Sequence, residues 1–134
     1  MAKYNNELTE SHGKVYHSKV EAQYDNILRA LLKEGRIKKI ERQVRYALPD
    51  FNWLEKGTRR FAYIPDFVVT RADGHRVVLE VKGFMPAAQK VKYAFFQYVY
   101  QMPVYIIKKA TLTADTERWL NAKPTTTKAN IQAQ

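Results

Sequence analysis

Residues 61–82 read FAYIPDFVVTRADGHRVVLEVK, and this stretch decides the fold. Residues 61–70 and 76–82 are both rich in aromatic and β-branched side chains, which is typical of strands. Between them lie residues 71–75, which contain the Asp73-Gly74 dipeptide that favours tight turns. The stretch therefore predicts a β-hairpin.

Charged side chains interrupt these apolar strands: Asp66 lies in the first, and Glu80 and Lys82 lie in the second. Alternate residues of a strand share a face, so Glu80 and Lys82 point to the same side. A turn centred on Asp-Gly would place Glu80 opposite Phe67 and Asp66 opposite Val81. A shift of one residue, or a bulge, would instead bring Asp66 and Glu80 to the same face. The sequence leaves both registers open.

Two carboxylates within apolar strands need compensation, because burial and mutual repulsion both disfavour their charged forms. A bound Mg²⁺ or Mn²⁺ would supply it, since these cations prefer hard oxygen ligands. The alternative is a cross-strand ion pair of Lys82 with Asp66 or Glu80 that only stabilises the sheet. The chain has no Cys, no zinc-like spacing of its three His and no Gly-rich phosphate loop, so it offers no other catalytic set.

The segments before the hairpin predict a helix, a strand and a loop. From residue 18 onward, apolar side chains recur with the period of a helix. We expect Ser18 and Glu21 to form a capping box at the start of this helix and Gly35 to end it. In residues 37–48 the helical period gives way to an alternation of side chains between two faces, which predicts a strand with one polar face. Residues 49–60 predict a connecting loop.

The segments after the hairpin predict two helices and a strand. Pro86 opens a helix that Pro103 breaks. Residues 104–107 predict a short buried strand, and residues 113–120 a last short helix. The apolar face expected for the helix after Pro86 comprises Val91, Ala94, Phe95, Tyr98, Val99 and Met102.

A chain of 134 residues, 46% of them hydrophobic, predicts a single domain. We expect a flexible N-terminal arm at residues 1–15, the domain at residues 16–122 and a disordered tail at residues 123–134. No apolar run is long enough to cross a bilayer, so we expect no membrane partner. The absence of Cys fits a cytoplasmic protein.

The charge balance points to a polyanionic partner. The chain carries 23 Lys and Arg against 13 Asp and Glu, a net charge of +10. A domain this basic is typical of nucleic-acid-binding proteins, although a merely solvated cationic surface is the alternative. The residues predicted to contact DNA are Lys33, Arg36, Lys38, Lys39, Arg42, Arg45, Lys56, Arg59, Arg60, Lys90 and Lys92.

The spacing of the charged hairpin residues matches a known pattern. Pro65-Asp66, then thirteen residues, then Glu80-Val81-Lys82 resembles the PD-(D/E)xK signature of the restriction-endonuclease-like nuclease superfamily. The helix with Glu21, the strand with Gln43, the hairpin and the basic aromatic helix follow in that superfamily's order. Residues 16–107 resemble small phage nucleases, including the endonuclease I type of Holliday-junction resolvase, and a phage-associated group of unassigned function.

The resemblance implies an α/β fold with a restriction-endonuclease-like core, a mixed central sheet of about four strands flanked by helices. It implies that Asp66, Glu80 and the Val81 carbonyl bind the metal and that Lys82 orients or helps to deprotonate the attacking water. Glu21 would complete the metal site, although it also fits its capping role. By the same resemblance Gln43 is a further polar residue at the DNA.

The function implied is that of a Mg²⁺-dependent DNA endonuclease that hydrolyses phosphodiester bonds, selective for branched DNA such as Holliday junctions. Phage DNA recombination or processing, in the cytoplasm of a phage-infected or prophage-carrying bacterium, is the expected setting. A junction is cut on two strands, so this function requires a homodimer. The alternatives are a non-catalytic DNA-binding module on the same fold and a nuclease acting on single strands, ends or RNA.

Overall fold

The computed structural model describes residues 9–11, 14–16, 19–48, 61–82 and 85–123. A four-stranded sheet in the order β3-β6-β7-β8 forms the centre. Its strands are β3 (Ile37–Glu41), β6 (Phe67–Arg71), β7 (Arg76–Val81) and β8 (Val104–Ile107). β3, β6 and β7 are antiparallel neighbours and β8 runs parallel to β7, so the expected α/β fold with a mixed sheet of four strands is confirmed.

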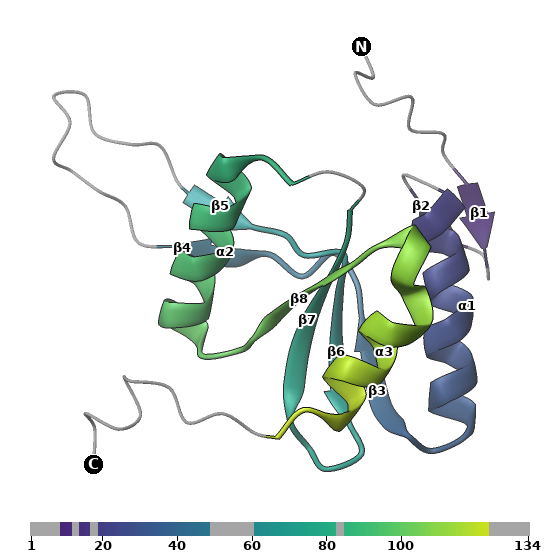
Figure 1. The fold of residues 1–134 in the computed structure, drawn as a ribbon. Coiled ribbons are helices and arrows are strands. Elements are labelled where there is room, and N and C mark those ends of the chain that lie inside the picture. The colour runs from purple at the N-terminus through teal and green to yellow at the C-terminus, as the bar shows by residue number, and fades with distance from the viewer. Residues whose placement is uncertain (1–8, 12–13, 17–18, 49–60, 83–84, 124–134) are drawn as a thin grey trace, which may run out of the picture.

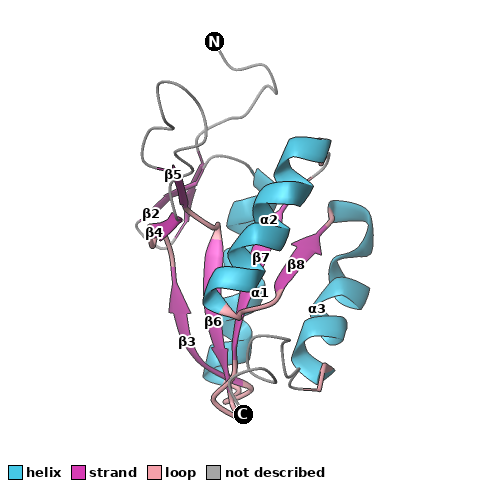
Figure 2. Cartoon of the chain, turned by 90° about the vertical axis from the view of Figure 1, so that its left-hand side faces the viewer, coloured by secondary structure: helices cyan, strands magenta, loops and turns pink. Residues whose placement is uncertain are grey.

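The two faces of the sheet are covered by different elements (Figure 1). α1 (Lys19–Lys33) and α3 (Leu112–Asn121), which follows a 3₁₀ turn at Lys109–Thr111, pack on one face. α2 (Ala87–Tyr100) and a two-stranded ribbon of β4 (Tyr46–Leu48) and β5 (Phe61–Tyr63) pack on the other. Figure 2 views the molecule from the side of α2. In the described part of the chain, no helix has the length and apolar character needed to cross a membrane.

Trp119 of α3 lies at the centre of the core beneath α1 and is completely buried. Its indole Nε1 donates a hydrogen bond of 2.7 Å to the hydroxyl of Tyr24, which also hydrogen-bonds to Oγ1 of Thr116 at 2.7 Å. The polar side-chain atoms of Trp119, Tyr24 and Thr116 are therefore all hydrogen-bonded, Thr116 Oγ1 also to the Leu112 carbonyl. Trp119 is a packing residue.

The strand predicted at residues 37–48 is two strands in the structure. Gln43 adopts a left-handed backbone conformation with φ of 59°, and residues 42–45 form no ladder. β3 before this bend pairs with β6, whereas β4 after it pairs with β5. Gln43 therefore lies on an exposed bend, because the chain changes from one sheet to another there, and the expectation that a strand carries it was wrong.

The strand predicted at residues 61–70 is also divided. β5 ends at Tyr63 and β6 begins at Phe67. Pro65 lies between them and has no N–H for a ladder hydrogen bond. Asp66 therefore sits in the connection, one residue before β6.

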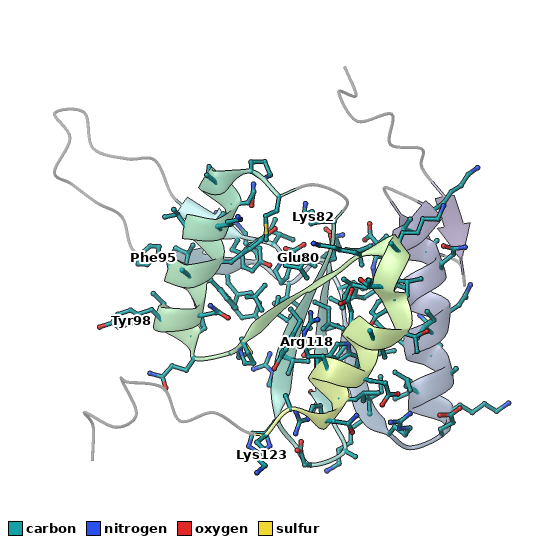
Figure 3. All side chains as sticks on the ribbon, in the orientation of Figure 1. Glu80, Lys82, Phe95, Tyr98, Arg118 and Lys123 are labelled. Atoms are coloured by element: carbon teal, nitrogen blue, oxygen red, sulfur yellow. The ribbon has the colours of Figure 1, made fainter. Side chains whose placement is uncertain are left out.

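The buried face of α2 matches the predicted one only in part: Met102 is buried, and Phe95 and Val99 pack against the core. Tyr93 and Phe96 are its buried residues, whereas Val91 is 70% exposed and Tyr98 is 66% exposed. Apolar side chains occur all around this helix, so periodicity alone could not select the face that packs. Figure 3 shows Tyr98 pointing away from the sheet.

Part of the expected N-terminal arm is paired. β1 (Thr9–Ser11) and β2 (Lys14–Tyr16) form an antiparallel ribbon beside α1. The predicted loop at residues 49–60, the tail from residue 124 and the capping residue Ser18 lie outside the described residues.

Candidate functional site

The turn of the β6–β7 hairpin fixes how its charged residues face one another. Gly74 has φ of +90°, and the Arg71 N–H donates to the His75 carbonyl at 2.8 Å, so three residues form the loop. This geometry pairs Phe67 with Leu79. Continuing the register by one residue places Asp66 opposite Glu80. The structure therefore selects the register that brings both carboxylates to one face.

That face is the one covered by α2. Val68 and Val78, which alternate with the two acids along their strands, pack against Tyr93 and Phe96 of α2. Figure 3 shows Glu80 and Lys82 at the end of β7, between the sheet and α2. The hairpin thus presents its acids to a helix that carries aromatic and basic side chains.

Asp66 is held by the backbone of the neighbouring strand. The N–H of Val81 donates a hydrogen bond of 2.8 Å to Asp66 Oδ2. The side chain is half-buried, and the preceding Pro65 is buried. A backbone donor fixes the carboxylate more rigidly than a mobile side chain would.

Glu80 is 3% exposed, and the hydroxyl of Tyr63 donates a hydrogen bond to its Oε1. Burial, and then the nearby Asp66 carboxylate, raise the pKa of Glu80 to about 9. Burial and the Glu80 charge also hold the pKa of the Tyr63 hydroxyl far above its usual range, so Tyr63 is a hydrogen-bond donor. Holding Asp66 and Glu80 both charged is therefore unfavourable unless a cation binds between them.

A pocket of about 260 Å³ opens between these strands and α2. Its sheet side carries Asp66, Glu80 and Lys82, so the structure brings the three predicted hairpin residues together. Its helix side carries Gln89, Lys92 and Tyr93, and the remaining lining comes from residues 62–64. The Nζ of Lys92 lies 5.8 Å from the centre of the Tyr63 ring. Lys92, one of the predicted DNA-binding residues, therefore lies in the same pocket as the acids.

Glu21, a predicted metal ligand, does not line this pocket. It is on α1, which packs against the opposite face of the sheet. Its Oε2 forms an ion pair with Nη2 of Arg42 at 3.1 Å. The Arg42 guanidinium lies 5.7 Å from the centre of the Phe67 ring. Among the described residues no three acidic or histidine side chains gather as a metal site. The metal-ligand role of Glu21 stays a prediction, and so does that of the Val81 carbonyl.

Those predicted DNA-binding cations that the structure describes do not form one surface around the pocket. Arg36 precedes β3 and accepts a backbone hydrogen bond from Ala72 in the hairpin turn, at the end of the sheet away from Asp66 and Glu80. Its guanidinium lies 3.8 Å from Glu117. Six of the predicted DNA-binding residues are exposed: Lys33, Arg36, Lys38, Lys39, Arg45 and Lys90. Three others, Lys56, Arg59 and Arg60, lie outside the described residues.

The donor set of the pocket fits a divalent cation of the Mg²⁺ or Mn²⁺ class. Asp66 and Glu80 supply hard oxygen ligands from facing backbone positions, and the cation would relieve the repulsion that raises the pKa of Glu80. Lys82 adds a positive charge that opposes this shift. Two carboxylates beside a lysine can therefore hold a cation and still receive an anionic substrate.

Residues 1–114 match the sequence model of a family described as a protein of unknown function, DUF1064. The chain belongs to this DUF1064 family. No curated protein matches the chain.

Sequence reasoning on this DUF1064 protein missed the two tyrosines of the pocket. Tyr63 lies three residues before Asp66 on a predicted strand, so the pattern that located Asp66 could have located it. Tyr93 was one of several aromatic residues in α2, and only the packing of the helix shows which of them faces the acids.

Proposed function

We propose that this protein is a metal-dependent DNA endonuclease of the PD-(D/E)xK type. The observation that carries the proposal is the meeting of Asp66, Glu80 and Lys82 in one pocket. The net charge of +10 supports an anionic polymer as substrate. A divalent cation bound there would neutralise a phosphodiester and promote the attack of water on it.

Each residue of the chain would contribute a defined part. Asp66 and Glu80 would hold the cation, with Asp66 positioned by the Val81 N–H and Glu80 by the Tyr63 hydroxyl. Lys82 would orient water or stabilise charge on the phosphate from the same strand end. The tyrosine hydroxyl and the backbone N–H thus preorganise the acids before the cation binds.

The finer proposal is selectivity for branched DNA by a homodimer. A four-way junction has two-fold symmetry, so two copies of the single site on each chain are required. The exposed Val91 and Tyr98 on the outer face of α2 offer apolar area for a second copy. Processing of phage DNA in the bacterial cytoplasm is the setting we propose for this activity.

A panel of substrates tests the activity and its selectivity together. Supercoiled, linear, single-stranded and four-way-junction DNA, and RNA, are each incubated with the protein in Mg²⁺ and in EDTA. We expect Mg²⁺-dependent cleavage within DNA, fastest on the junction. Binding to DNA without cleavage of any substrate would favour the non-catalytic DNA-binding module. Cleavage confined to single strands, ends or RNA would favour the other alternative.

A further inference from the structure

The pocket has two chemically different walls. The sheet wall carries the carboxylates of Asp66 and Glu80. The opposite wall is one face of α2, where Gln89, Lys92 and Tyr93 follow one another at positions i, i+3 and i+4 and therefore point the same way. An amide, an ammonium and a phenol are all hydrogen-bond donors.

Tyr93 places an unpaired polar atom on this wall, as far as the described residues show. The residue is 5% exposed, and its buried hydroxyl has no hydrogen-bond partner among the described residues. A buried polar group without a partner is costly, and such groups are rare in folded proteins. The hydroxyl makes no hydrogen bond to the nearby acids, so it is left to donate to a group that enters the pocket.

Two lysines of the pocket favour a negatively charged partner for the Tyr93 hydroxyl. Burial, and then the charges of Glu80 and Asp66, raise the pKa of the Tyr93 hydroxyl above its usual range. A tyrosine hydroxyl is protonated at neutral pH in any case, so it offers a proton to an acceptor oxygen. Lys82 and Lys92 favour an acceptor with negative charge.

We infer that Gln89, Lys92 and Tyr93 form the phosphate-binding wall of the pocket, with the Tyr93 hydroxyl donating a hydrogen bond to a phosphate oxygen of the nucleic acid. The inference rests on the proposed function and adds to it the residues that bind a phosphate of the substrate. It assigns the two walls separate tasks: the sheet wall holds the cation, and α2 holds the phosphate that the cation faces.

Binding of thymidine 5′-monophosphate tests the inference without cleavage. The nucleotide is titrated into the full chain in the presence of Ca²⁺, and binding is followed by amide NMR shifts. We expect Tyr93→Phe to weaken binding about tenfold, the cost of one hydrogen bond to a charged acceptor. Glu34→Ala is the control, because Glu34 is exposed and does not line the pocket. It should bind as the wild type does.

Stability separates a binding role from a packing role. The Tyr93 hydroxyl has no partner in the described part of the chain, so Tyr93→Phe should unfold at the same temperature as the wild type or at a higher one. Gln89→Ala, a change in the first turn of α2, gives a second variant in which nucleotide binding should weaken while the fold is kept.

The outcomes distinguish this inference from the proposed function. Wild-type binding that is unchanged in Tyr93→Phe, or no binding of the nucleotide by the wild type, overturns the phosphate-binding wall. A loss of stability in Tyr93→Phe equal to its loss of binding would overturn it as well. The absence of Mg²⁺-dependent cleavage would overturn the proposed function instead, whatever the nucleotide does.

Discussion

Asp66 accepts a hydrogen bond of 2.8 Å from the backbone N–H of Val81, one residue beyond Glu80 on the neighbouring strand. The bond fixes the carboxylate of one strand connection to the end of β7. The two acids thereby keep their relative positions through backbone geometry. Preorganisation of this kind is what a metal site needs, because the ligands do not have to be gathered when the ion arrives.

Cation binding should depend on both acids. Mn²⁺ titration followed by the electron paramagnetic resonance of the free ion should show binding by the wild type. Asp66→Ala and Glu80→Ala should each weaken it at least tenfold, because each removes a charged oxygen ligand. Glu34→Ala, at an exposed acid, is the control and should bind normally. Equal affinity in all four proteins would refute the site.

The stability of the metal-free protein should fall as the pH rises from about 5 to about 9. Folded Glu80 keeps its proton up to its pKa of about 9, whereas the unfolded chain releases it near the ordinary value of 4.5. Unfolding between these values therefore releases a proton and is favoured by higher pH, by at most about 1.4 kcal/mol per pH unit. Thermal unfolding in EDTA should show this decline, and Glu80→Gln should reduce it. Parallel curves for the two proteins would contradict the assignment.

The hydroxyl of Tyr24 should contribute measurably to stability. Tyr24→Phe leaves the buried Trp119 Nε1 without its acceptor and removes one of the two hydrogen bonds of Thr116 Oγ1, which keeps its bond to the Leu112 carbonyl. We expect the free energy of unfolding to fall by about 1–3 kcal/mol in urea denaturation. In the control Glu34→Ala, at an exposed position, the change should stay within about 0.5 kcal/mol. A Tyr24→Phe protein as stable as the wild type would show that the network contributes nothing.

Assembly should depend on the outer face of α2. Light scattering at working concentration should give the mass of a dimer, and Val91→Asp with Tyr98→Asp should give that of a monomer, because both residues are exposed apolar groups on this face. The same measurement is made with junction DNA present. A wild type that stays monomeric under both conditions would exclude paired junction cleavage and leave a simpler nicking nuclease.

The sequence predicted the hairpin and its three charged residues but not how they face one another. An Asp-Gly pair occurs in both two-residue and three-residue turns, and the two differ by one position in register. The loop here has three residues, with Gly74 in the left-handed position, and this places Asp66 opposite Glu80. A local turn geometry, rather than hydrophobic pattern, decided whether the acids could meet.

The helix wall of the pocket could not be predicted in the same way. α2 has aromatic and aliphatic side chains on all sides, so its hydrophobic period does not define one buried stripe. Contacts with β4 and β5, which come from distant parts of the chain, select Tyr93 and Phe96 as the inward residues. The sequence alone therefore could not identify Tyr93 as a site residue, because only the packing of α2 places it in the pocket.

The most direct test of a metal-dependent nuclease site is the nicking of supercoiled plasmid by single-site variants. In Mg²⁺ we expect the wild type to cut, and Asp66→Ala, Glu80→Ala and Lys82→Ala to lose cleavage while they keep DNA binding in Ca²⁺ and a folded circular dichroism spectrum. EDTA should stop the wild type. Cleavage by folded variants at the wild-type rate would contradict the account, and unfolding of the variants would show that these residues only stabilise the sheet.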